Sequence, residues 1–104
     1  MQYKIYQLKD TRNTNYAFCS WKEAKEMFSI DDYKEVYSGN MAQLHILEEL
    51  FEIFNLRHPE DFRGHSMSVS DVVALKKPDK DYWYWYYCDE RGWEEISHLI
   101  NGGD

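Results

Sequence analysis

The chain lacks an excess of basic residues, since it carries 12 lysines and arginines against 19 aspartates and glutamates and has a net charge of -7 over 104 residues. Domains that bind nucleic acid or anionic membranes normally present a basic face. We therefore expect no direct nucleic-acid binding and no membrane partner. No apolar run approaches the ~20 residues of a membrane span, and the first ten residues do not have the layout of a signal peptide. These absences predict a cytoplasmic protein.

Cysteine is also scarce. Cys19 and Cys88 are far apart in the sequence, and no Cys-x-x-Cys pair occurs. Small secreted scaffolds carry more cysteines, and structural zinc sites need closely spaced ones. We expect two reduced thiols packed as small apolar side chains, with no cofactor and no metal site. The oligomeric state is left open by the sequence.

What the chain does have is apolar residues (43%) and aromatic residues (17%), enough for one folded domain over residues 1–104. Strand-like alternation or enrichment in β-branched and aromatic residues occurs at 3–8, 33–37, 69–75, 81–88 and 93–96, with a short extended piece at 16–19. Helical spacing occurs at 21–28 and 41–54. Both faces of the 3–8 strand are apolar, so we expect both to be at least partly covered. The order predicts an α+β fold with a mostly antiparallel sheet of about five strands, two helices and a C-terminal three-stranded meander.

The polar run over residues 58–71 is the first candidate site, because it concentrates groups that can do chemistry. They are His58, Asp61, Arg63, His65, Ser66, Ser68 and Asp71. A hydrolase would pair a serine with a histidine and an acid, but no nucleophile-elbow glycines surround these serines. A metal site would use two histidines and one aspartate, but their spacing fits no helical ligand pair.

A structural role explains the 58–71 run better. Asp61 and the serines can satisfy amides of a tight loop, Gly64 permits a bend, and Asp71 can hold the turn that enters the next strand. A binding surface on the same loop stays the alternative, and it would use Arg63 and His65. We therefore expect no enzymatic activity.

The run Tyr-Trp-Tyr-Trp-Tyr-Tyr at residues 82–87 is the second candidate site. Alternation sends Tyr82, Tyr84 and Tyr86 to one side of a strand and Trp83, Trp85 and Tyr87 to the other. Two helices can cover one face fully, so we expect some ring surface to stay exposed. Exposed aromatic surface on a small protein usually marks a partner. The predicted docking residues are Trp83, Trp85, Tyr87 and Trp93.

The acidic residues offer a different hypothesis. A small acidic protein can occupy a basic nucleic-acid channel by presenting carboxylates in place of phosphates. The charges that would do so are Glu48, Glu49, Glu52, Glu90, Glu94 and Glu95. An ordinary solvated surface is the plainer interpretation.

The segment from Phe54 to Ile96 resembles the YodL-like domain family. The similarity is carried by Asn55, His58, Pro59, Asp61, Phe62, Arg63, Gly64, His65, Ser66, Ser68, Val69, Ser70 and Asp71, and by Tyr86, Tyr87, Asp89, Gly92 and Trp93. The opening YKIYQLKD and the segment DYKEVYSG are also similar to that family. The resemblance implies a small protein or module of Firmicutes and their mobile elements, with a regulatory or accessory role, and it provides no catalytic assignment to transfer to this chain.

We therefore expect a non-catalytic interaction domain, accessory to a mobile element or to host regulation. It would dock on a protein partner through the aromatic strand and the 58–71 loop. The alternative is an acidic inhibitor of a nucleic-acid-handling enzyme, of the anti-CRISPR type.

Overall fold

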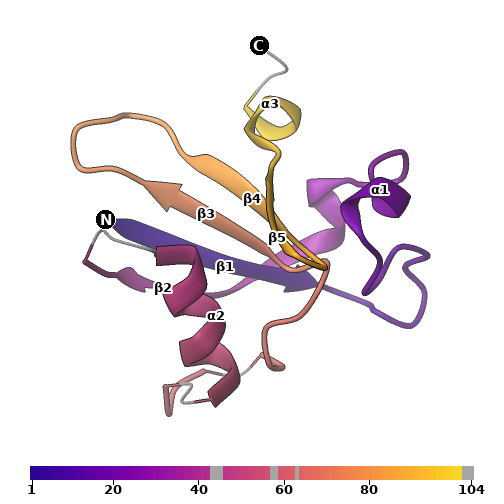
Figure 1. Cartoon of the computed structure of the whole chain (residues 1–104), viewed down its shortest axis with the longest axis horizontal. Helices are drawn as coiled ribbons and strands as arrows, with labels where there is room; N and C mark the ends of the chain where they lie inside the picture. The colour runs from indigo at the N-terminus through magenta and orange to yellow at the C-terminus, as the bar shows by residue number, and fades with distance from the viewer. Residues whose placement is uncertain (43–45, 57–58, 63, 102–104) are drawn as a thin grey trace.

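The computed structural model describes residues 1–42, 46–56, 59–62 and 64–101 (Figure 1). Its centre is a five-stranded antiparallel sheet with the strand order β2-β1-β3-β4-β5. The strands are β1 (Gln2–Leu8), β2 (Tyr33–Asn40), β3 (Val72–Lys76), β4 (Tyr84–Asp89) and β5 (Gly92–Glu95). The helices are α1 (Trp21–Ala24), the 3₁₀ turn η1 (Ile30–Asp32), α2 (Ile46–Leu56) and α3 (Ser97–Ile100). The predicted α+β class and the C-terminal meander are confirmed.

Several predicted boundaries are wrong for identifiable local reasons. Residues 16–19 form a turn rather than an extended piece, with Phe18 at φ 63°. The helix expected over 21–28 stops at Ala24, whose carbonyl accepts from the amides of both Met27 and Phe28. Strand β3 starts at Val72 and not at residue 69, because Ser70 adopts a φ of 83° that a strand cannot contain.

The second predicted helix is confirmed in position but differs at both ends. Its described part begins at Ile46 and continues to Leu56. Met41 is not helical, since its amide donates to the Met1 carbonyl at 2.9 Å. Residues 43–45 lie outside the described ranges. Within those ranges, none of the helices has the length and apolar character that crossing a membrane requires.

Helix α2 packs across one face of the sheet and closes the first hydrophobic core (Figure 1). Strand β1 contributes Tyr3 and Ile5, and β3 contributes Val73 and Leu75. The helix and the following loop supply Ile46, Leu50, Phe54, Phe62 and Met67. The 59–71 loop is therefore packed into this core through Phe62 and Met67 and does not extend freely into solvent.

The opposite face of the sheet carries a second core near the C-terminal end of β1. The segment between β1 and β2 covers it with Tyr16 and Ala24, which pack over Leu8, Tyr33, Val72, Tyr87 and Ile96. Phe28 and Trp21 place their rings against Tyr87, at 6.1 and 4.9 Å between centroids. Ile100 of α3 and, from the sheet, Tyr6 and Trp85 also pack against this core but stay only partly buried.

Two leucines of α2 test the first core directly. Leu50 is fully buried, whereas Leu56 is 75% exposed. We expect Leu50→Ala to lower the free energy of unfolding by about 2–5 kcal/mol, because it removes buried methyl groups and leaves a cavity. Leu56→Ala should change it by no more than about 0.5 kcal/mol. Urea unfolding followed by circular dichroism measures both, and equal costs would contradict the packing of α2 on the sheet.

Candidate functional site

The 59–71 loop is tied to strand β1 by one buried side-chain amide, that of Gln7, which is 2% exposed. Its Nε2 donates to the His65 carbonyl at 2.8 Å and to Asp71 Oδ2 at 3.0 Å. Its Oε1 accepts from the His65 backbone amide at 3.2 Å. Both hydrogens and the oxygen of this amide are thus used to fix the loop, as a buried polar group requires.

Asp71 is the second buried member of this network and is 1% exposed. Its Oδ2 also accepts from the Ser68 amide at 3.0 Å, which confirms the prediction that Asp71 holds the turn before its strand. Burial raises the pKa of the Asp71 carboxyl to about 7, although the Ser68 amide, the nearby His65 and the Gln7 amide act in the opposite direction.

Gly64 allows the loop to approach Gln7 closely. A Cβ atom at this position would collide with Gln7 Oε1 and would lie 2.8 Å from the Phe62 ring. Phe62 is itself core, so neither neighbour can move freely. The loop therefore needs glycine at position 64 for space, and the predicted bend residue has a packing reason.

The side-chain oxygens of two loop serines, Ser68 and Ser70, are enclosed by the fold. Ser70 Oγ accepts from the Phe18 amide at 2.9 Å, and the Ser70 carbonyl accepts from the Tyr33 hydroxyl at 2.6 Å. Ser68 Oγ is buried without a hydrogen-bond partner among the described residues. Over the described ranges, no serine hydroxyl is hydrogen-bonded to His65, whose Nδ1 instead lies 2.7 Å from the Ser66 carbonyl oxygen.

No cluster of three or more potential metal-ligating side chains occurs in the part of the chain that the structure describes. Two of the loop residues singled out from the sequence, His58 and Arg63, lie outside the described residues.

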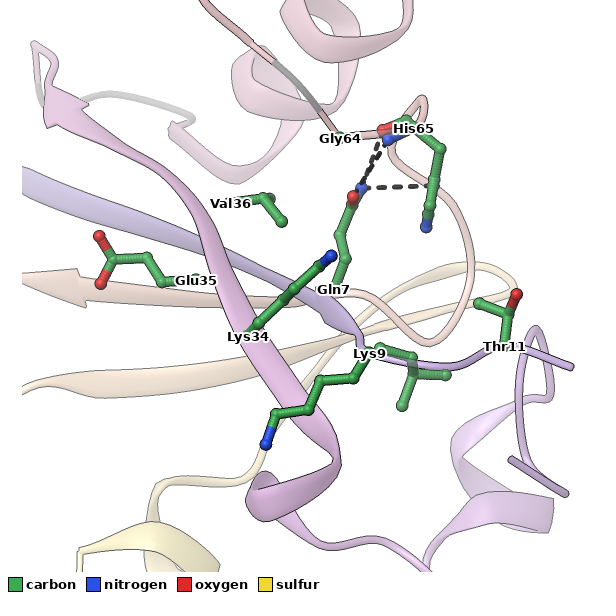
Figure 2. A pocket seen from close by; sticks show the side chains of 9 residues that line it. Gln7, Lys9, Thr11, Lys34, Glu35, Val36, Gly64 and His65 are labelled. Atoms are coloured by element: carbon green, nitrogen blue, oxygen red, sulfur yellow. Dashed lines mark hydrogen bonds between the residues drawn. The ribbon is translucent and has the colours of Figure 1, made fainter. Parts of the chain in front are cut away.

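A pocket of about 480 Å³ opens beside the Gln7 network, between the end of β1, the start of β2 and the Gly64–His65 turn (Figure 2). His65 is exposed at its wall, and Lys34 from β2 extends toward Gln7. The pocket is lined by Gln7, Leu8, Lys9, Thr11, Lys34, Glu35, Val36, Gly64 and His65.

The aromatic residues of the 82–87 run are divided between the two faces of the sheet, as the alternation predicts. Trp85 lies next to Tyr6 of β1 on the face opposite α2, with ring centroids 5.1 Å apart. Trp83 contacts the same face through Lys4, whose ammonium is 4.8 Å from the Trp83 ring centroid. We call Lys4, Tyr6, Trp83 and Trp85 the open aromatic face. The sequence did not single out Lys4 or Tyr6 for it.

Two predicted docking residues do not belong to the open aromatic face. Tyr87 is fully buried and its hydroxyl donates to the Cys19 carbonyl at 2.6 Å, so it offers no surface to a partner. Trp93 is half-buried against the α2 core. His65 is on the α2 side as well, held there by Gln7, and so the structure does not join the loop and the tryptophans into one surface.

The six glutamates of the acidic hypothesis are all exposed. Glu48 from α2 and Glu90 from the β4–β5 turn line the same hollow of about 280 Å³, together with Phe51 and Trp93. The structure therefore brings the two acidic segments together around an apolar hollow, which the sequence did not predict.

Comparison with known proteins gives one match. A family model described as YodL-like domain matches residues 2–98. No curated protein and no solved structure matches the chain. The description of the family names no activity, so the match supports the fold and the sequence resemblance but assigns no site.

The buried Asp71 gives a testable pH dependence. Because its folded pKa of about 7 lies above the ordinary value of 3.8, the folded state holds this proton more tightly. The contribution of Asp71 to stability is full below that ordinary value and is lost as the pH rises to about 7. The Asp71→Asn variant has no carboxyl group to titrate at this position and should not show the loss. The free energy of unfolding of Asp71→Asn, minus that of the wild type, should therefore increase as the pH rises from 3.8 to about 7.

Urea midpoints measured at intervals across this pH range test the expectation. The exposed Asp79→Asn is the matched control and should follow the wild type at every pH. A pH-independent difference between Asp71→Asn and the wild type would show that the carboxyl titrates normally.

Proposed function

Because the chain belongs to the YodL-like domain family, for which no activity is named, we propose a function from the geometry: a non-catalytic protein-interaction domain. It docks on a protein partner through the open aromatic face. The observation that carries this proposal is that two indole rings and one phenol ring, those of Trp83, Trp85 and Tyr6, are only half-buried on the face opposite α2, at the margin of the second core.

The strand register supports a continuous surface. Lys4 pairs with Ala74, which pairs with Trp85, and Gln2 pairs with Lys76. Paired residues of antiparallel strands point to the same side, so these side chains share the face opposite α2. Ala74 in the middle is small and fully buried, so the larger rings of Tyr6 and Trp85 meet beside it.

The chemistry of this face favours one kind of partner. Tyrosine and tryptophan are the residues that most often carry binding energy in interfaces. Lys4 and Lys76 share this face with Glu35, whose carboxylate lies 3.8 Å from Lys4 Nζ, so charges of both signs surround the rings. The occupant we propose is a protein segment with apolar anchor residues that pack against these rings. The wider role, accessory to a mobile element or to host regulation, is part of the same proposal.

Substitution of Trp83 tests the docking surface. We expect Trp83→Ala to weaken partner binding by about 2 kcal/mol or more, as truncation of a central anchor does. The measurement is photo-cross-linking from a position next to Trp83 in a lysate of the source organism. It is followed by calorimetric titration of the purified partner with each variant.

Trp93→Ala is the matched control, since it removes the same side chain from the other face and should leave binding unchanged. Equal binding by the wild type and Trp83→Ala would exclude the open aromatic face. A cross-link between two copies of this chain would also contradict the proposal, because the occupant would then be the protein itself.

The acidic-inhibitor function stays as the second candidate, and the hollow shared by Glu48 and Glu90 is the observation that favours it. Salt separates the two functions. Docking through rings should survive about 0.5 M salt, whereas binding by carboxylates that imitate phosphates should weaken by orders of magnitude. Glu90→Gln would reduce binding only in the second case.

A further inference from the structure

The pocket beside Gln7 has a charge opposite to that of the whole protein. The ionisable side chains along it are Lys9, Lys34, Glu35 and His65, in a chain whose net charge is -7. Lys34 is exposed and has no ion-pair partner among the described residues. Figure 2 shows its ammonium group extending toward Gln7 and the His65 loop. The Lys34 ammonium therefore creates a locally positive potential, which raises the concentration of anions at the pocket.

The other charged groups of the pocket do not cancel Lys34. Glu35 is directed to the opposite face, where its carboxylate lies 3.8 Å from Lys4 Nζ. Lys9 Nζ donates to the Asp31 carbonyl at 2.9 Å, away from the pocket (Figure 2). Asp71 is buried behind Gln7, which donates to its carboxyl group.

The hydrogen bonds around His65 determine which ring nitrogen is available. Gln7 uses its two N–H hydrogens on the His65 carbonyl and on Asp71, so it has none left for the ring. His65 Nδ1 is therefore the protonated nitrogen and donates to the Ser66 carbonyl at 2.7 Å. Nε2 is left at the free end of the ring, where it accepts a hydrogen bond when neutral and donates one when the ring is protonated (Figure 2).

We propose that this pocket binds a small phosphorylated molecule, whose phosphate group lies between the Lys34 ammonium and the His65 ring, with Thr11 at the rim. Lysine is a point charge suited to a tetrahedral oxyanion, and charge-assisted hydrogen bonds are the stronger ones. The pocket volume of about 480 Å³ leaves room for more than the phosphate. The Gln7 network and Gly64 hold the His65 wall in place before the ligand arrives. This site is on the α2 side of the sheet and does not depend on the open aromatic face.

The binding should depend on pH with a defined sign. The titratable and charged groups around the phosphate position are Lys34, His65 and, behind Gln7, Asp71. Burial raises the pKa of the Asp71 carboxyl to about 7, and protonation of this carboxyl removes a negative charge near the pocket. This change favours the anion, so affinity should be higher at about pH 6 than at about pH 8.

Anion titrations followed by NMR of the full chain test this site. Inorganic phosphate should shift the His65 ring resonances and the Gln7 side-chain amide in a saturable way. Sulfate, whose charge stays constant over this range, should do the same more tightly at the lower pH. Lys34→Gln should weaken both by about tenfold, whereas Lys80→Gln, an exposed lysine on the β3–β4 connection, should bind like the wild type.

Acetate and chloride at matched ionic strength are the control anions. Saturation by phosphate and sulfate, but not by these two, supports a tetrahedral oxyanion site. Equal saturation by acetate would assign the pocket to carboxylates and overturn the phosphate proposal. Shifts that stay linear in phosphate concentration, or that are the same in Lys34→Gln, would exclude an anion site altogether.

Discussion

The side-chain amide of Gln7 joins two parts of the chain that are far apart in the sequence. It connects the end of β1 to two positions of the 59–71 loop, His65 and Asp71, and all of its donors and its acceptor are used. A buried amide with lost partners would cost about 1–3 kcal/mol for each unsatisfied group. The same clamp keeps Phe62 and Met67 of the loop in the α2 core.

The two faces of the sheet are covered by different segments. On the α2 side, the loop and the helix close a core and leave the pocket beside His65. On the other side, the segment between β1 and β2 packs over Leu8, Val72 and Tyr87, and Trp83 and Trp85 stay half-buried. A partner protein on the open aromatic face and an anion in the pocket could therefore be bound at the same time.

Much of the fold could be predicted, because strand alternation and helical spacing are local properties of the sequence. The strands near 3–8, 33–37 and 93–96 and the helix near 41–54 were found from their patterns. The exceptions involve contacts between segments that are distant in the sequence. Ser70, whose positive φ precedes β3, accepts hydrogen bonds from the Phe18 amide and the Tyr33 hydroxyl, and neither partner is near in the sequence. Gln7 was overlooked, although a polar residue after Tyr3 and Ile5 on an apolar face was a signal.

Local sequence patterns are sufficient to predict the α+β class, the family resemblance and most of the strands. They also separate Trp83 and Trp85 from Tyr84 and Tyr86, because successive side chains of a strand point to opposite faces. Which of these rings are buried is a property of the folded chain. Tyr87 points the same way as Trp85, but it lies under Trp21 and Phe28 and is lost to the core. Burial depends on which distant segment packs over each position, and no local pattern carries that information.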